Sequence, residues 1–159
     1  MGRRYAVIAE QLIQAPTPAR RGREARNEGE PVQVLTAMLI AMHLSAPYPL
    51  VLMVVAEAQA ADVDPHLACA VVTVESEWYP NARNVHAWGT DHGLMQVCDR
   101  YHRVTGDVRL DTRTGLMFLA SLLREYPERE ALARYRAGGK WREYLGYADA
   151  VMRLRDKLR

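Results

Sequence analysis

The chain has 159 residues, of which 49% are apolar and 25% are charged, values that are typical of one soluble globular domain. This composition excludes a disordered chain, a collagen-like repeat and a small disulfide-stapled protein. The formal net charge is only +2, so composition provides no argument for nucleic-acid binding. We therefore expect no nucleic-acid partner.

The charges are unevenly distributed along the chain. Residues 134–159 hold six Arg, two Lys and three acidic residues, whereas residues 31–133 hold seven Arg and twelve acidic residues. The basic C-terminal stretch has two interpretations. It is either the solvated face of a terminal helix, or a surface that approaches an anionic polymer such as nucleic acid, cell-wall glycan or lipid head groups.

The first thirty residues change character part-way. A short apolar pattern, Tyr5-Ala6-Val7-Ile8, gives way to a polar stretch that contains Pro16-Thr17-Pro18 and Arg20-Arg21-Gly22-Arg23. Such punctuation favours an exposed segment without regular structure. We predict a polar, basic N-terminal arm over residues 1–30, which is either a linker or a segment that docks on a partner.

A long uncharged run follows the arm, because residues 31–56 contain no Asp, Glu, Lys or Arg. Pro47 and Pro49 divide it into two pieces, each shorter than the roughly 20 residues of a membrane span. We predict an apolar helical segment over residues 31–48 and a separate domain over residues 49–159. A signal sequence, with Ala58-Gln59-Ala60 as a small-residue cleavage site, and a membrane span are the alternatives.

The helix-cap signals and the apolar spacing of the remaining residues are typical of helices, and the predicted fold class is all-α. Asp64-Pro65 combines an N-cap with Pro at the first helical position, which predicts a helix over residues 65–78. Apolar spacing predicts further helices over residues 112–126, 128–136 and 141–158. Residues 79–93 are rich in Pro, Asn, Gly and His and indicate a loop, and residues 94–104 indicate a short helix or turn. No alternating strand pattern persists.

Two cysteines, Cys69 and Cys98, are present. Their spacing does not match a zinc site. We expect two buried free thiols, with a single disulfide as the alternative.

Glu75 is the carboxylate that is best placed to take part in acid–base chemistry. It lies near the C-terminal end of an otherwise apolar predicted helix, where the helix dipole disfavours negative charge. Apolar neighbours disfavour it further through desolvation. Both effects predict a raised pKa, which suits a general acid at neutral pH. The alternative is an ordinary exposed residue at the end of the helix, and without a family resemblance the residues alone favour it. Glu77 is two positions along, on another side of the helix, and we expect it to be solvated or paired with Arg83 or Arg100.

A family resemblance is carried by four blocks of sequence that occur in the right order. They are Ala61-Asp62-Val63-Asp64-Pro65; Val74-Glu75-Ser76-Glu77-Trp78-Tyr79-Pro80-Asn81-Ala82 with Gly89 and Gly93-Leu94-Met95-Gln96; Asp111 and Gly115 with Phe118-Leu119; and Ala131-Leu132-Ala133-Arg134-Tyr135-Arg136-Ala137-Gly138-Gly139. Together these blocks resemble the soluble lytic transglycosylase family over residues 50–158. Arg136 stands where the family has Asn, and the loop before Gly93 is longer than usual.

The resemblance implies a lysozyme-like helical domain that cleaves peptidoglycan. We expect no cofactor, and we assign no metal because His86 and His92 are not spaced as metal ligands. Glu75 would be the catalytic acid and base, protonating the bond between N-acetylmuramic acid and N-acetylglucosamine and then closing a 1,6-anhydro ring. It implies further that Ser76 hydrogen-bonds near the site, that Met95 and Gln96 line the sugar groove, and that Tyr135 hydrogen-bonds to Glu75. Those four residues are the candidate substrate-binding set.

The expected partners are peptidoglycan glycan strands and, through residues 1–48, other proteins of a virion or of cell-envelope machinery. We expect action in the periplasm or cell wall, on a phage particle that enters cells or, alternatively, after export. Two other functions remain open. One is a structural or glycan-binding protein with an inactive domain of this type, and the other is a lysozyme-type hydrolase in which Asp91 or Glu77 positions water.

Overall fold

The computed structural model describes residues 29–159, which form a mostly helical domain with one small sheet. The predicted arm over residues 1–30 therefore lies almost entirely outside the described residues. The helices are α2 (Gly29–Leu44), α3 (Tyr48–Ala60), α4 (Pro65–Ser76), α5 (Val108–Glu125), α6 (Glu128–Ala137) and α7 (Leu145–Leu158), with a 3₁₀ helix η1 (Gly138–Tyr144) between the last two. The helical fold class is confirmed, while the division at residues 30 and 48 stays a prediction.

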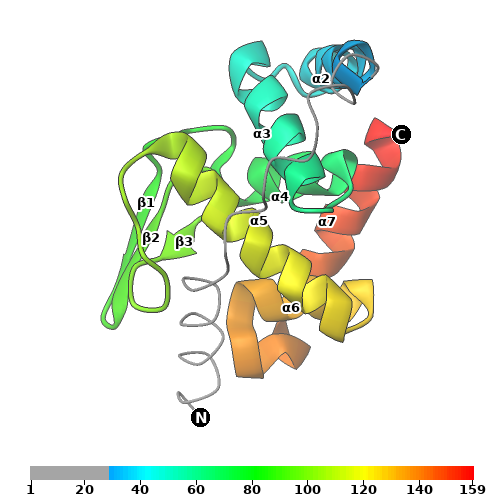
Figure 1. Ribbon diagram of the computed structural model, residues 1–159. Helices are drawn as coiled ribbons and strands as arrows, with labels where there is room; N and C mark the ends of the chain where they lie inside the picture. The colour runs from blue at the N-terminus through cyan, green and yellow to red at the C-terminus, as the bar shows by residue number, and fades with distance from the viewer. Residues whose placement is uncertain (1–28) are drawn as a thin grey trace.

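The helices surround a single apolar core. Helix α4 packs against α3 on one side and α7 on the other, and α5 contacts both α3 and α6. In Figure 1, α5 crosses the molecule diagonally, with the small sheet beside its N-terminal half and α6 near its C-terminal end. The fully buried side chains of the core include Leu94, Met95, Leu116, Leu119 and Leu132.

Residues 79–93 are not the simple loop that their composition predicts. They contain β1 (Arg83–His86) and β2 (Gly89–His92), which pair antiparallel, and β3 (Val97–Cys98) pairs with β2 to complete the sheet. The β1 residues are largely exposed, so no apolar alternation marks the strand. Polar contacts hold the sheet instead, because Asp99 accepts a 2.9 Å hydrogen bond from the backbone N–H of Thr90.

Several helix boundaries differ from those predicted, each for a local reason. Helix α5 begins at Val108 because the Asp107 side chain caps it, accepting from the backbone N–H of Leu110 at 2.9 Å. The final helix begins at Leu145, not at residue 141, because the preceding seven residues form η1. Within residues 94–104, for which a short helix or turn is predicted, the structure has turns on both sides of β3.

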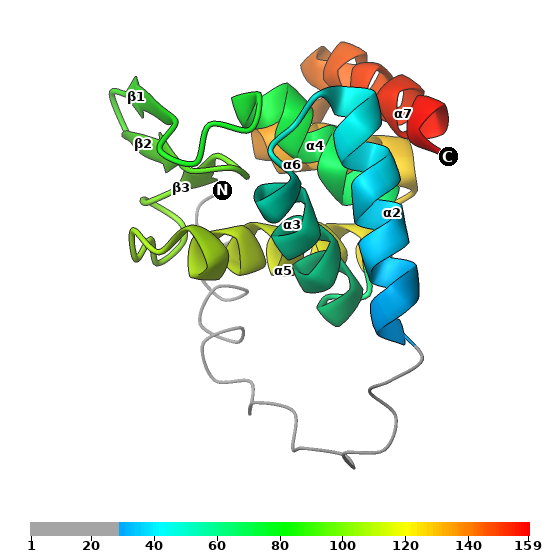
Figure 2. The ribbon, with the colours of Figure 1, turned by 90° about the horizontal axis from the view of Figure 1, so that it is seen from above.

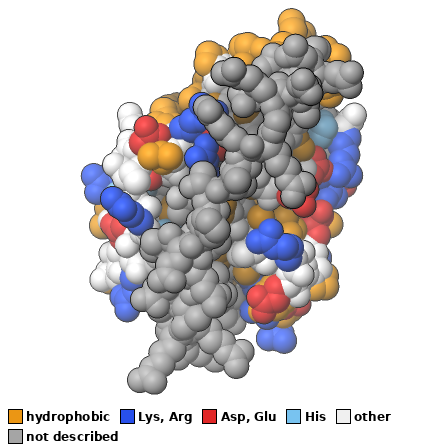
Figure 3. All heavy atoms as spheres, in the orientation of Figure 1, with side chains coloured by type: hydrophobic (Ala, Val, Ile, Leu, Met, Phe, Trp, Pro, Cys, Tyr) orange, Lys and Arg blue, Asp and Glu red, His pale blue; other side chains and the backbone are white. Residues whose placement is uncertain are grey.

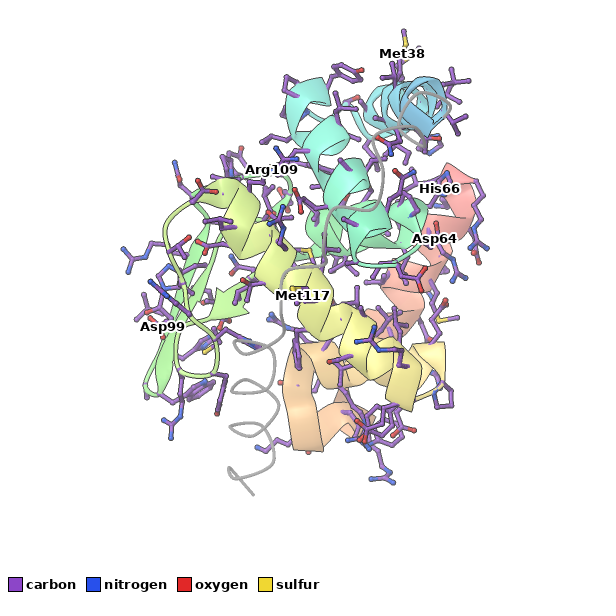
Figure 4. The ribbon with its side chains drawn as sticks, in the orientation of Figure 1. Met38, Asp64, His66, Asp99, Arg109 and Met117 are labelled. Atoms are coloured by element: carbon purple, nitrogen blue, oxygen red, sulfur yellow. The ribbon has the colours of Figure 1, made fainter. Side chains whose placement is uncertain are left out.

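Helix α2 lies beside α3, on the side of the domain opposite the sheet (Figure 2). Ala37, Ile40 and Ala41 face the core. The other face of α2 is apolar and exposed, and Met38 points away from the body of the domain in Figure 4. Hydrophobic side chains gather at the top of the space-filling view, where Figure 1 shows α2 (Figure 3). The exposed apolar face of α2 consists of Val32, Val34, Leu35, Met38, Leu39 and Met42.

No helix among residues 29–159 has both the length and the apolar character needed to cross a bilayer.

Both cysteines are free, and Cys69 is buried while Cys98 is partly exposed. Burial raises the pKa of the Cys69 thiol to about 12, so this side chain behaves as a small core residue. The alternative of a disulfide between the two cysteines is thus wrong.

Gly115 sets the distance between α5 and the segment that leads into β3. A Cβ atom added at Gly115 would lie 2.5 Å from the Cβ of Met95 and 3.0 Å from its Cγ. We expect Gly115→Ala to lower the free energy of unfolding by about 1–3 kcal/mol through overpacking, measured by urea denaturation. The matched control is Gly146→Ala in α7, where an added Cβ would meet nothing within 4 Å. A Gly115→Ala variant as stable as the unmodified protein would contradict this packing.

Candidate active site

Glu75 lies in the last turn of α4, and the helix begins where the sequence predicts. The Asp64 side chain accepts a 3.0 Å hydrogen bond from the backbone N–H of His66, and Pro65 occupies the first helical position. The residues between form a buried helix that leads directly to Glu75. The Glu75 side chain is only 3% exposed, so α4 delivers a carboxyl group into the interior of the domain.

The chain reverses immediately after α4, which separates Glu75 from Glu77. Glu77 and Trp78 both adopt left-handed backbone conformations, with φ values of 49° and 67°. The reversal leaves Glu77 in solvent, as expected, and buries Trp78, whose indole N–H donates to the Thr73 hydroxyl at 2.9 Å. Trp78 therefore belongs to the core, and Glu77 lies outside the site.

Two side chains from distant parts of the sequence hold the carboxyl group of Glu75. The Tyr147 hydroxyl, on α7, donates to Glu75 Oε1 at 2.7 Å. Arg136, near the end of α6, donates from Nη1 to Glu75 Oε2 at 3.1 Å. Both oxygens of Glu75 therefore have a hydrogen-bond donor.

The hydrogen bond expected between Tyr135 and Glu75 is not formed. The Tyr135 hydroxyl donates instead to the backbone carbonyl of Met95 at 2.6 Å. The neighbouring helix α7 supplies the tyrosine that contacts Glu75, and this residue was not among the predicted site residues. Tyr147 lies on the same helical stripe as Ala148 and Val151, which predicts its burial; its partner, however, depends on how α7 packs against α4.

The pKa of Glu75 is raised, as the sequence predicts. Burial is the largest cause, and the negative charge of Asp91 on β2 acts in the same direction. The Tyr147 hydrogen bond and the Arg136 charge lower the pKa without cancelling the effect of burial. Burial and the charge of Glu75 also raise the pKa values of Tyr135 and Tyr147 well above normal, so both phenols keep their protons and act as donors.

The other candidate residues lie close to this centre, with their polar groups used inside the domain. Ser76 is buried, and its hydroxyl donates to the carbonyl of Val72 at 3.1 Å. Met95 is 1% exposed and lies in the core. The Gln96 amide donates to the carbonyl of Gly93 at 2.9 Å, which braces the turn before β3. Substrate contacts for these residues and Tyr135 stay a prediction.

The β1–β2 hairpin carries polar and aromatic side chains that the loop prediction left without partners. His86 contacts Asp91 at 2.8 Å between Nε2 and Oδ2. The same imidazole stacks on Trp88, with ring centroids 4.7 Å apart and an interplanar angle of 4°. Trp88 remains 54% exposed, so the hairpin presents a flat aromatic surface to solvent. His86 thereby links that surface to Asp91, the second carboxylate near Glu75.

Within residues 29–159, no group of three or more His, Cys, Asp or Glu side chains is arranged to hold a metal ion. The contacts of Glu75 are instead those of a proton-transfer group. It is a buried carboxyl that has a raised pKa and is oriented by a neutral phenol.

The family model described as the transglycosylase SLT domain matches residues 53–151. The chain belongs to the transglycosylase SLT family. The match spans Glu75 and all four predicted substrate-binding residues, so it confirms the resemblance found in the sequence. Transglycosylase SLT domains are associated with lytic transglycosylase activity on peptidoglycan. None of the curated proteins and none of the solved structures compared with the chain matches it.

Tyr147 and Tyr135 of this SLT domain can be distinguished by how their substitution changes the pH dependence of activity. Tyr147→Phe removes a hydrogen bond that lowers the pKa of Glu75, so we expect that pKa to rise. In the pH profile of kcat/KM, the limb at which activity is lost with increasing pH should therefore move to higher pH. The value of kcat should also fall about tenfold, because Glu75 is less well oriented without this hydrogen bond. In Tyr135→Phe the limb should stay in place, and equal shifts in both variants would contradict the assignment.

Proposed function

We propose that this protein is a lytic transglycosylase that cleaves the β-1,4 bond between N-acetylmuramic acid and N-acetylglucosamine in peptidoglycan. The single observation that carries the proposal is the carboxyl group of Glu75, which is buried, has a raised pKa and is held by Tyr147. A buried acid of this kind stays protonated at higher pH than an exposed glutamate. It is therefore suited to donate a proton to a glycosidic oxygen.

The reaction needs only one carboxyl group. Glu75 donates its proton to the glycosidic oxygen as the bond to the muramic acid C1 breaks, and the leaving N-acetylglucosamine hydroxyl keeps that proton. The resulting carboxylate then accepts the proton of the C6 hydroxyl, whose oxygen bonds to C1 and closes the 1,6-anhydro ring. Because the nucleophile is part of the substrate, its high effective concentration replaces the second carboxylate of an ordinary glycosidase.

A hydrolase of the lysozyme type is the second candidate, and Asp91 is the observation that favours it. The negative charge of Asp91 acts on Glu75, and His86 contacts its carboxylate. A second carboxylate near the acid is what an inverting or retaining hydrolase requires. Glu77 does not support this candidate, because it lies in solvent beyond the end of α4.

Product analysis distinguishes these candidates. Purified protein is incubated with murein in water enriched in ¹⁸O, and the released fragments are measured by mass spectrometry. Transglycosylation yields anhydro ends without solvent oxygen, whereas hydrolysis yields reducing ends that carry one ¹⁸O atom. Glu75→Gln serves as the control for contaminating enzymes. Release of no fragments by the unmodified protein under any condition would favour a structural or glycan-binding role.

We also propose that the enzyme acts in the periplasm or cell wall, carried by a virion or by envelope machinery that it contacts through residues 1–48. The exposed apolar face of α2 supports a contact of this kind, because an apolar helix surface favours burial against another protein. Immunodetection in purified particles and in cell-envelope fractions tests the location. Recovery in the cytosolic fraction alone would contradict it.

A further inference from the structure

Both oxygens of the Glu75 carboxyl group accept a hydrogen bond, which bears on how readily the group holds its proton. Oε1 accepts from the hydroxyl of Tyr147, and Oε2 accepts from the guanidinium of Arg136. Hydrogen bonds donated to both oxygens favour the charged form of the carboxyl group over the protonated form. Release of one of the two donors would therefore favour the protonated form that a general acid needs.

Arg136 is the donor that is free to leave. The Tyr147 hydroxyl is buried with Glu75, whereas the Arg136 side chain is 34% exposed and extends from the end of α6. A guanidinium has five N–H groups, and among residues 29–159 Arg136 uses only Nη1 in a hydrogen bond or ion pair. It can therefore exchange Glu75 for another acceptor, and Glu75 Oε2 is then left to take up a proton.

The surroundings of Arg136 favour an anionic acceptor. The 3₁₀ helix η1, which follows α6 and packs against it, carries Lys140 and Arg142. Neither forms a salt bridge with an acidic side chain in the described part of the chain, whereas Arg134 on α6 is paired with Glu130 at 2.6 Å. Cations on the element that follows α6 favour an anion on this side of the domain. A guanidinium binds a carboxylate through two parallel hydrogen bonds.

We propose that Arg136 is a specificity-determining residue that binds a carboxylate of the peptide stem on the muramic acid residue, and that this exchange frees Glu75 Oε2 to take up a proton. The inference rests on the proposed function and adds the substrate class: glycan strands whose stems carry free carboxylates. The proton comes from solvent, and no covalent bond changes in the exchange. Stems without negative charge leave the guanidinium on Glu75.

The groups that act on Glu75 come from three elements. Tyr147 faces it from α7, Arg136 and Tyr135 from α6, and Asp91 from β2. Of the two that lower the pKa of Glu75, Arg136 alone carries a charge. When the guanidinium moves to the stem, the pKa of Glu75 therefore rises, and the acid form becomes available in the same step that binds the substrate.

A binding experiment tests the exchange without requiring turnover. The ligand is a disaccharide-peptide with an acidic stem, and its comparison ligand has the stem carboxylates converted to methylamides. Calorimetry on the unmodified protein should give about tenfold tighter binding of the acidic ligand, which is the effect of one charge-assisted hydrogen-bonded pair. In Arg136→Gln this ratio should fall to about one, and Arg136→Lys should restore part of it.

The matched control is Arg129→Gln. Arg129 lies on the same helix and forms an exposed ion pair with Asp149 at 2.6 Å, so its removal changes the net charge equally without touching Glu75. The control should retain the ratio of the unmodified protein. NMR titration of Glu75 should show its pKa rising on addition of the acidic ligand and staying unchanged with the methylamide ligand.

The outcomes separate the inference from the proposed function. Arg136-dependent preference for the acidic ligand, together with no cleavage of murein, would support the inference and overturn the function. Cleavage of acidic and amidated strands at equal rates would support the function and overturn the inference. An Arg136→Gln variant that keeps the tenfold preference would also overturn it.

Discussion

Glu75→Gln is expected to lower kcat on murein by at least about a thousandfold, because the amide cannot donate a proton to the glycosidic oxygen or accept one from the C6 hydroxyl. Gln keeps a carbonyl oxygen that accepts from Tyr147, so the local structure should persist. The rate of release of soluble fragments measures the effect. Glu77→Gln is the matched control, since Glu77 is exposed just past α4, and its rate should stay within about twofold of the unmodified protein. A Glu75→Gln enzyme that keeps a tenth of the activity would refute the assignment.

The same substitution should stabilise the protein at neutral pH. The folded-state pKa of Glu75 is raised, chiefly by burial, so the folded protein binds this proton more tightly than the unfolded chain does. The free energy of unfolding therefore falls as pH rises from the ordinary glutamate pKa to the raised one. Glu75→Gln removes this cost, and its melting temperature should exceed that of the unmodified protein at pH 7. The difference should disappear at a pH below the ordinary pKa of Glu, and a difference that does not depend on pH would contradict the explanation.

The second large effect is expected at Glu57, which joins α3 to α5. Its side chain is 2% exposed, and Arg109 and Arg113 of α5 donate to it at 2.5 and 2.7 Å; Figure 4 shows Arg109 between the two helices. The double variant Arg109→Gln/Arg113→Gln leaves the buried carboxylate without a cation. We expect the free energy of unfolding at pH 7 to fall by about 3–5 kcal/mol, measured by urea denaturation.

The loss should be non-additive and dependent on pH. Each single variant keeps one arginine on Glu57, so the two single losses should sum to less than the double loss. Burial by itself raises the pKa of Glu57, but its hydrogen bonds and charge interactions with Arg113 and Arg109 outweigh burial and lower it. The pair therefore stabilises the fold above the ordinary glutamate pKa, and this stability is lost as pH falls through the lowered value.

Two controls make this prediction specific. Arg124→Gln, an exposed change in the last turn of the same helix, should alter stability by less than about 0.5 kcal/mol. Adding Glu57→Gln to the double variant should recover most of the lost stability, because it removes the unpaired buried charge. If the triple variant is no more stable than the double variant, the loss does not come from Glu57.

The sequence alone predicted the helical fold class and the order of most helices, and it indicated Glu75 as a carboxyl group with a raised pKa. Apolar spacing and the Asp64-Pro65 start are local signals, and α4 begins at the residue they indicate. The direction of the Glu75 pKa shift was also predictable, because a helix C-terminus and apolar neighbours in the same helix are local features. The sheet could not be predicted in this way, since β1 is largely exposed and β2 is half-buried along its whole length, so neither strand shows apolar alternation. Polar contacts of Asp91 and Asp99 hold these strands instead.

The partners of Glu75 were decided only by the tertiary structure. Tyr147 lies 72 residues and Arg136 lies 61 residues along the chain from Glu75. Tyr135, the tyrosine favoured by the family pattern, donates to a backbone carbonyl instead. A one-dimensional pattern specifies which face of a helix is buried, but it does not specify what the neighbouring helix presents there. The sequence thus determined a helical domain with a buried carboxyl group at the end of α4, whereas the packing of α7 against α4 and α6 decided which groups contact that carboxyl group.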